Sequence, residues 1–143
     1  MEYEFHQELK SAVYHFMRRN NWVVAREVQL PNHRIADIIA MNIAARVLIV
    51  EVKTTAKDYL LCEAVNKYGA YCDGLYIAIP EREAENLNHE PLLLTFMQEW
   101  GTVGILGVRG RKISIMRQPV AKNIPTERRL DILERIARAR PAW

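Results

Sequence analysis

The sequence has little cysteine and no long hydrophobic run, and each shortage excludes a class of protein. Only Cys62 and Cys72 occur among 143 residues, and no second pair of cysteine or histidine stands at zinc-finger spacing. The two cysteines therefore indicate buried thiols in a reducing compartment rather than a zinc centre. Every uncharged run falls far short of the roughly 20 apolar residues that cross a bilayer, so no membrane association is expected.

Two catalytic signatures are also missing. The sequence has no glycine-rich phosphate loop, and no serine or cysteine lies in a nucleophile-elbow pattern. Hydrolysis of nucleoside triphosphates and acyl transfer are therefore disfavoured, and no nucleotide cofactor is expected. The opening stretch, MEYEFHQELK, carries acids where a signal peptide would carry basic residues, which predicts a cytoplasmic protein.

The composition is that of an ordinary globular domain. Half of the residues are apolar and 26% are charged. A chain of 143 residues can bury a substantial core, so we predict a single domain over residues 1–143. The net charge of +3 is compatible with a nucleic-acid partner but does not require one.

The order of predicted elements in the first half indicates an α/β fold. Residues 2–20 should form an amphipathic helix, and strands are predicted over 22–30, 34–41, 46–54 and 75–79, with a helix over 57–71. The third strand is apolar on both faces, so it should lie centrally and be covered on both sides. We expect a central mixed sheet of about five strands, flanked by helices on both faces.

The second half is predicted to close this fold. The polar residues 81–90 should form a surface loop, and a short helix with proline in its first turn is expected over 91–100. A hairpin and a basic helix are predicted within 101–140. That helix should begin at a capping threonine, Thr126, and it carries five arginines.

Three charged residues interrupt the apolar strands: Asp37, Glu51 and Lys53. Strand alternation puts Glu51 and Lys53 on one face, with Asp37 on the neighbouring strand. Two carboxylates held close together repel each other unless a cation lies between them, and such oxygen ligands suit Mg2+ or Mn2+. The lysine could stabilise charge on a phosphate. The trio therefore fits phosphodiester hydrolysis, and the alternative is a structural ion pair at a strand end.

These residues carry a resemblance to a known superfamily. Asp37, followed after thirteen residues by Glu51-Val52-Lys53, resembles the PD-(D/E)XK nucleases, although Ala36 stands where the motif has proline. The resemblance implies a restriction-endonuclease-like core over about residues 2–80 and a Mg2+-dependent (or Mn2+-dependent) endodeoxyribonuclease. Asp37, Glu51, the Val52 carbonyl and Glu8 would hold the metal, with Lys53 assisting catalysis. Glu4 is the alternative to Glu8.

Two longer stretches give a narrower resemblance. VEVKTTAKDY, beginning at Val50, and YCDGLYIAIP, beginning at Tyr71, are similar to the MmcB-like DNA-repair proteins within that superfamily. This implies DNA as the partner and a role in repair, recombination or restriction. It also makes a homodimer plausible, with one site for each strand. A prokaryote, a virus or a mobile element would encode such a protein.

Basic residues near the predicted site are candidates for contact with the substrate backbone. We assign this role to His33, Arg34, Lys57, Lys67, Arg109, Arg111 and Lys112. The arginines of the last helix form a second basic set, and a solvated surface is the alternative for both sets. Two other functions stay open: a DNA-binding repair accessory with little or no cleavage, and a protein-interaction module.

Overall fold

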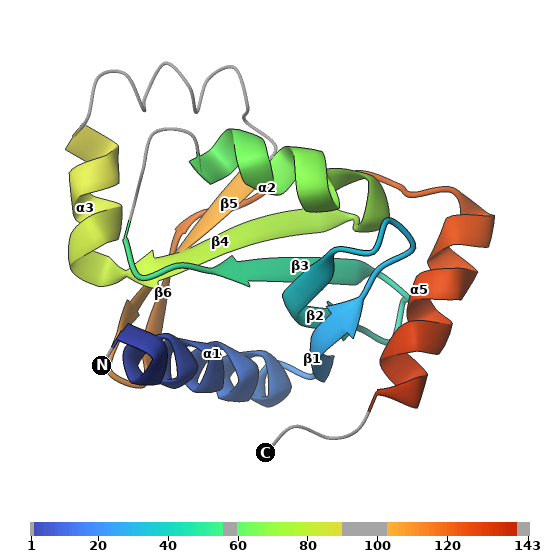
Figure 1. Ribbon diagram of the computed structural model, residues 1–143, viewed down its shortest axis with the longest axis horizontal. Helices are drawn as coiled ribbons and strands as arrows, with labels where there is room; N and C mark the ends of the chain where they lie inside the picture. The colour runs from blue at the N-terminus through green and yellow to red at the C-terminus, as the bar shows by residue number, and fades with distance from the viewer. Residues whose placement is uncertain (1, 56–59, 90–102, 140–143) are drawn as a thin grey trace.

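The structure is a computed structural model that describes residues 2–55, 60–89 and 103–139. Its centre is a six-stranded mixed sheet in the order β1-β2-β3-β4-β5-β6 (Figure 1). The strands are β1 (Val23–Gln29), β2 (Ile35–Met41), β3 (Val47–Val52), β4 (Gly74–Pro80), β5 (Val103–Arg109) and β6 (Lys112–Arg117). The sheet is therefore one strand wider than the expected five, and the mixed α/β architecture is confirmed.

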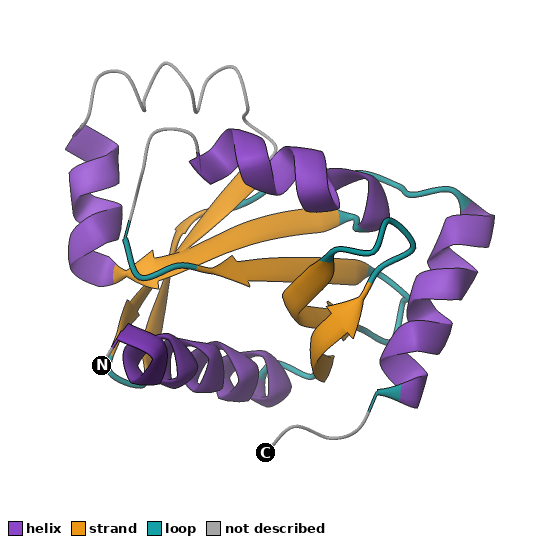
Figure 2. Ribbon diagram, in the orientation of Figure 1, coloured by secondary structure: helices purple, strands orange, loops and turns teal. Residues whose placement is uncertain are grey.

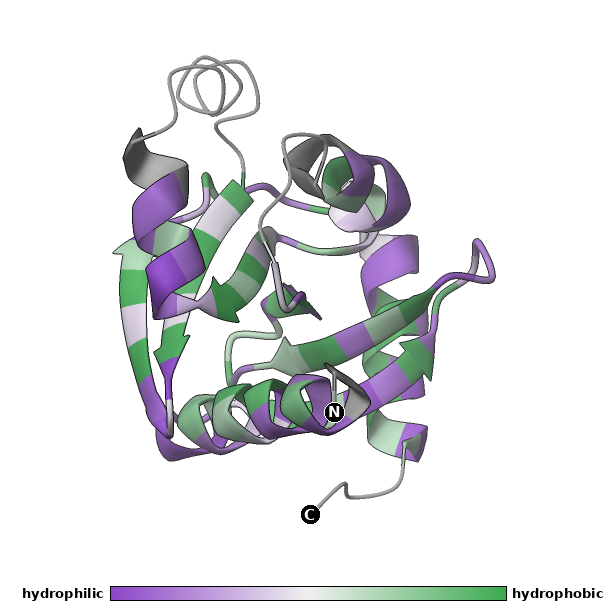
Figure 3. Ribbon diagram, turned by 60° about the vertical axis from the view of Figure 1, so that its left-hand side comes forward, coloured by the Kyte–Doolittle hydropathy of each residue, from purple (hydrophilic) through white to green (hydrophobic). Residues whose placement is uncertain are grey.

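Helices cover both faces of the sheet (Figure 2). On one face, α1 (Glu2–Arg19) packs its buried Leu9, Val13 and Met17 against the sheet. On the other face lie α2 (Leu60–Tyr68), the short 3-10 turn η1 (Gly69–Tyr71) and α5 (Thr126–Arg138). The strands between these layers are mostly hydrophobic, as Figure 3 shows. Within the described ranges, no helix is both long and apolar enough to span a membrane.

The central strand β3 is apolar on both faces, as its sequence predicts. Val47 and Ile49 belong to the core under α2 and α5, whereas Val50 and Val52 belong to the core under α1. The chain then crosses through α2 to β4, which pairs with β3 in parallel. A strand, a helix and a parallel strand in this order form the expected crossover unit.

The polar segment after β4 is a helix, and the expectation of a surface loop over 81–90 was wrong. Helix α3 spans Glu81–His89 and packs against β4 and β5. It follows Pro80 directly, and acidic residues at 81 and 83 suit the positive end of the helix dipole. Ala84 is its fully buried anchor. The buried face of α3 is therefore narrow. A narrow buried face gives little hydrophobic periodicity in the sequence, which explains the wrong prediction. The helix predicted over 91–100 lies outside the described residues.

The last helix begins where predicted but is capped differently. Pro125 occupies the N-cap position of α5 and makes no side-chain cap bond, so Thr126 is the first helical residue rather than the cap. Proline lacks a side-chain acceptor, and its fixed φ leads the chain into the first turn. The hairpin is confirmed, because β5 and β6 pair in an antiparallel register that brings Arg109 opposite Lys112.

A buried carboxylate, Asp73, joins four parts of the fold. It is 2% exposed and accepts hydrogen bonds from the backbone N–H of Val47 at 2.8 Å and of Ile124 at 3.1 Å. Arg129 of α5 pairs with both of its oxygens. Burial alone would raise the pKa of Asp73, but these hydrogen bonds and the Arg129 charge hold that pKa below its usual value.

Replacing Asp73 tests how much this junction stabilises the fold. Asp73→Asn should lower the free energy of unfolding by about 3 kcal/mol or more, because it leaves the Arg129 charge without its partner. Urea denaturation measures the change. Asp131→Asn is the matched control: its carboxylate pairs with Arg135 at 2.8 Å on the partly exposed surface, and its loss should cost no more than about 0.5 kcal/mol. Equal losses in the two variants would contradict this role of Asp73.

Acidification tests the same contact through its pH dependence. The folded-state pKa of Asp73 is lowered, so the stabilisation is complete above the unfolded-state pKa of about 3.9. It is lost as the pH falls through the lower, folded-state value. The gap in unfolding free energy between wild type and Asp73→Asn should therefore stay constant above about pH 5 and shrink below about pH 4. A gap that widens on acidification would contradict the lowered pKa.

Candidate functional site

The predicted acids meet at the edge of the sheet that the strand ends form, where β3 ends and β2 begins. The Val52 peptide group is fixed there from both sides. Its N–H donates to Oδ2 of Asp37 at 2.8 Å, and its carbonyl oxygen lies 2.7 Å from Nε2 of His6 in α1. This clamp holds Asp37 beside the end of β3. The convergence of β2 and β3 at this edge was predicted from the sequence, whereas the contribution of His6 from α1 was not.

A buried lysine from α1 balances one acid. Lys10 is 5% exposed, and its Nζ lies 3.5 Å from Oδ1 of Asp37 and 3.2 Å from Oε1 of Glu27. Burying an ammonium without a partner is costly, so these two carboxylates account for its position. Asp37 is thus held in place by Lys10 and by the Val52 N–H before any ligand arrives.

The second acid, Glu51, lacks full compensation. It is 6% exposed; its Oε1 lies 3.4 Å from Nζ of Lys53, while its buried Oε2 has no hydrogen-bond partner among the described residues. Burial and then the nearby charge of Asp37 raise the pKa of Glu51, and Tyr68 and Lys53 oppose that rise. The ionised carboxylate therefore needs a further positive group to be stable in place.

Tyr68 closes the site from α2. Its buried hydroxyl donates to the carbonyl oxygen of Ile35 at 3.1 Å. Burial, followed by the Glu51 carboxylate, raises the pKa of Tyr68, so the phenol stays protonated. Tyr68 also lines a small hollow with Glu51, Lys53, Glu63, Ala64 and Lys67. The hollow places two lysines beside the buried acid.

The donor set fits a hard divalent cation. Asp37 uses one contact on each oxygen and the Val52 carbonyl uses one, so each of these oxygens keeps a lone pair. The unpartnered Oε2 of Glu51 supplies the remaining protein oxygen. The described residues contain no cluster of three or more acids, histidines or cysteines able to hold a metal. Two carboxylates with water and substrate phosphate are the usual set for Mg2+.

Glu8, the ligand expected from the first helix, does not join this site. It is exposed and lines a separate cleft with Arg19 and Arg111. Residues two positions apart in a helix differ by about 200° around its axis. His6 and Lys10 face the end of β3, so Glu8, which lies midway between them in sequence, faces away from it. The preference for Glu8 over Glu4 rested on its nearness to the apolar face, which does not determine which residue reaches the end of β3.

The predicted nucleic-acid contacts divide between two places. Lys67 lines the hollow beside Glu51, and Arg34 is an exposed residue just before β2 whose charge lowers the pKa of Tyr68. His33 is an exposed turn residue with a φ of 69°, and Lys57 lies outside the described residues. Arg111 and Lys112 belong to the β5–β6 hairpin.

Most of the remaining basic candidates have partners within the fold. Arg109 pairs with Glu81 at 3.5 Å. In α5, Arg128 donates to the Ala70 carbonyl, and Arg129, Arg135 and Arg138 pair with Asp73, Asp131 and Glu134. These four arginines of the last helix therefore already have partners within the protein.

Sequence reasoning missed His6, Lys10 and the polar contacts of Tyr68. The available signal was their spacing: His6 and Lys10 are four residues apart, and Lys10 immediately follows the buried Leu9. A lysine next to a buried helical stripe indicates a buried anionic partner. The hydroxyl bond of Tyr68 to Ile35 could not be inferred from the sequence pattern.

Comparison with known proteins gives one family and one related structure. The family model described as DNA repair protein MmcB-like matches residues 3–142. A solved protein of unknown function from Silicibacter pomeroyi has a similar fold, with a TM-score of 0.74 and 17% identity over 92% of this chain and 83% of that chain. No curated protein matches the sequence.

The unpartnered acid predicts opposite effects from two substitutions. In a chelator at pH 8, Glu51→Gln should raise the melting temperature by about 2–5 °C, because it removes a poorly compensated buried charge. Lys53→Gln should lower it, because it removes the cation beside Glu51. Differential scanning calorimetry measures both.

Adding Mg2+ or Mn2+ should then raise the melting temperature of the wild type but not of Glu51→Gln, since a ligand stabilises only the state that binds it. Glu127→Gln, an exposed change in α5, is the control and should respond to the cation as the wild type does. An equal response in Glu51→Gln would show that the cation binds elsewhere.

Proposed function

Because the chain belongs to the MmcB-like family of DNA repair proteins, we propose that it is a metal-dependent deoxyribonuclease that hydrolyses phosphodiester bonds. The observation that carries the proposal is the unpartnered, buried Oε2 of Glu51 beside Asp37 and Lys53. A stabilising structural ion pair would leave no such atom, because an unsatisfied buried oxygen costs about 1–3 kcal/mol. A site that receives a cation accounts for it.

Each residue has a chemical role in this proposal. Asp37, Glu51 and the Val52 carbonyl would hold Mg2+ or Mn2+, and Lys10 and His6 orient two of these ligands. When bound, the cation supplies Lewis acidity toward the phosphate and water.

Lys53, whose side chain is 39% exposed, can leave Glu51 to meet a phosphate oxygen and stabilise the negative charge that grows there. Solvent would protonate the leaving oxygen, because Glu51, the buried acid of this site, would hold the cation. Lys67, which lines the hollow with Glu51, and the exposed Arg34 would contact the neighbouring backbone.

One observation favours a second function. Asp37 already has the Lys10 ammonium and the Val52 N–H as partners, and the Val52 carbonyl already has His6. Such satisfied groups suit a DNA-binding repair accessory with little or no cleavage. The two functions differ in what Glu51 does, since the accessory has no use for an unpartnered buried carboxylate.

Cleavage assays separate the two functions. Supercoiled plasmid, single-stranded DNA and branched DNA are incubated with Mg2+ or Mn2+ and, as a control, with a chelator. Lys53→Ala and Glu51→Gln should each lower the cleavage rate at least about 100-fold, because each removes an interaction with the charge that develops in the reaction. A homodimer with two sites would linearise plasmid, whereas a single site would accumulate nicked circles.

Matched variants guard against a general loss of charge. Lys122→Ala changes a lysine that donates to the Gly69 carbonyl, and Glu127→Gln changes an exposed acid of α5; both should cut as the wild type does. Binding without cleavage on every substrate in both metals would reject the nuclease in favour of the accessory. Cleavage that survives in Lys53→Ala and Glu51→Gln would reject this site.

A further inference from the structure

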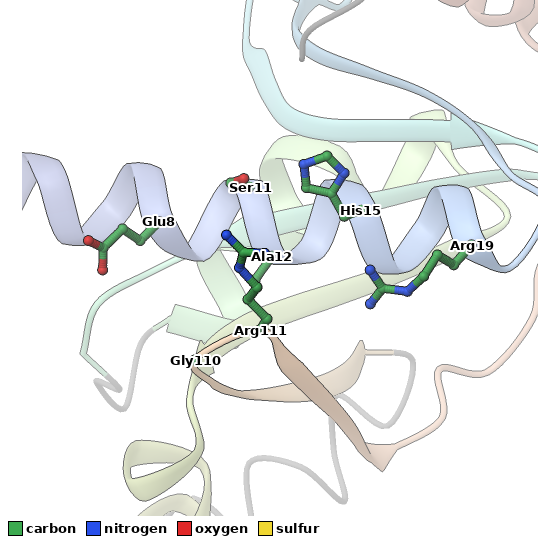
Figure 4. A pocket seen from close by; sticks show the side chains of 7 residues that line it. All are labelled: Glu8, Ser11, Ala12, His15, Arg19, Gly110 and Arg111. Carbon is green, nitrogen blue, oxygen red and sulfur yellow. The ribbon is translucent and has the colours of Figure 1, made fainter.

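A cleft of about 530 Å3 lies between α1 and the β5–β6 turn, apart from the acids. One face of α1 contributes Glu8, Ser11, Ala12, His15 and Arg19, and the turn contributes Gly110 and Arg111. Figure 4 shows Arg111 extending from the turn toward α1, in this view between Glu8 and Arg19. The cleft is thus polar and carries guanidinium groups from two different elements.

The two arginines of the cleft differ from several others in the fold. Arg109, Arg129, Arg135 and Arg138 each pair with a carboxylate. In the part of the chain that the structure describes, neither Arg19 nor Arg111 has a carboxylate partner. A guanidinium offers five N–H donors in a fork that matches phosphate oxygens. Both groups therefore keep their donors for a ligand.

The hairpin fixes where Arg111 stands. Arg109 faces Lys112 in the ladder, so Gly110 and Arg111 form a two-residue turn. Gly110 has a φ of +60°, as the first position of a type II′ turn requires, and no atom lies within 4 Å of an added Cβ. The tip of the turn is therefore tight but open to a ligand. His15 instead packs edge-on against Tyr14, with ring centroids 5.3 Å apart, and receives no role here.

The turn end of the cleft, at Gly110 and Arg111, lies at the same edge of the sheet as the acids. Strands β3, β4 and β5 run parallel, so Glu51 and Arg109 are both near carboxyl ends at this edge. The ends of β3 and β4 and the start of α1 lie on one side of the molecule (Figure 1). Strands are about 4.8 Å apart, so β5 is about 10 Å from β3.

We propose that this cleft binds backbone phosphates of the DNA substrate, through Arg19 and Arg111, away from the bond that would be cut at Glu51 and Lys53. The proposal extends the proposed function by naming a second contact on the same strand. Glu8 lies beside the two arginines and would weaken the attraction for phosphate. A phosphate on a free nucleotide has the same chemistry, so the test includes one.

Fluorescence anisotropy with labelled 20-nucleotide single-stranded and duplex DNA, in a chelator, measures binding without chemistry. Arg19→Gln and Arg111→Gln should each weaken binding about tenfold. Each should also lower the slope of log binding constant against log salt concentration by about one, the value for one lost phosphate contact. Glu8→Gln should strengthen binding severalfold. Arg138→Gln is the matched control, because it removes the same charge from an arginine already paired with Glu134 at 2.6 Å, and it should bind within about twofold of wild type.

Three results would overturn the proposal. The cleft variants could bind DNA as the wild type does, Arg138→Gln could weaken binding equally, or a deoxynucleoside monophosphate could displace the oligonucleotide as well as an unlabelled 20-mer. The last result would assign the cleft to a small molecule. Failure of the nuclease is distinguished from failure of the cleft by comparing binding with cleavage. If only the cleft is right, Arg111→Gln weakens DNA binding in the chelator although the wild type cuts no substrate. If only the acids are right, the wild type cuts DNA and Arg111→Gln binds as the wild type does.

Discussion

The burial of β3 on both faces is the constraint on which the rest of the structure depends. Val47, Ile49, Val50 and Val52 are all fully buried, so the middle of this strand has no place for a charge. Charged groups can occur only at its end, where the sheet stops and water or a ligand can reach them. Glu51 and Lys53 lie there, and the neighbouring parallel strands bring their own carboxyl ends to the same edge. The location of the candidate site follows from the packing of the core.

Two buried carboxylates at opposite ends of the sheet show contrasting solutions. Asp73, where β4 begins, receives two backbone N–H groups and an arginine fork, and its pKa is lowered. Glu51, near the end of β3, has one lysine at 3.4 Å, and its pKa is raised. Oε2 of Glu51 is the one buried side-chain polar atom without a partner among the described residues. Among the described residues, a buried side-chain polar atom without a hydrogen bond therefore occurs only at this edge of the sheet.

The sequence predicted what depends on short-range periodicity. The first helix, the strands and the hairpin each have a strong repeat of apolar residues, and the spacing of Asp37 to Glu51 and Lys53 follows from two adjacent strands joined by a short turn. Helix α3 was missed because it buries little apolar surface. The neighbours of the acids were missed for another reason: which residues of α1 face the strand end depends on how the whole helix is rotated on the sheet. That rotation is a tertiary property, and it selected His6 and Lys10 instead of Glu8.

The two-residue turn at Gly110 and Arg111 has a consequence for the thermodynamics of binding. A long loop would have to lose many backbone conformations before its arginine met an anion, at a cost of about 1–2 kcal/mol for each residue that becomes ordered. This turn is already restricted by the ladder on both sides, where Val108 pairs with Ile113 and Arg109 with Lys112. Only the side chain remains to be ordered, so the hairpin acts as a preorganised support whose conformational entropy is lost during folding rather than during binding.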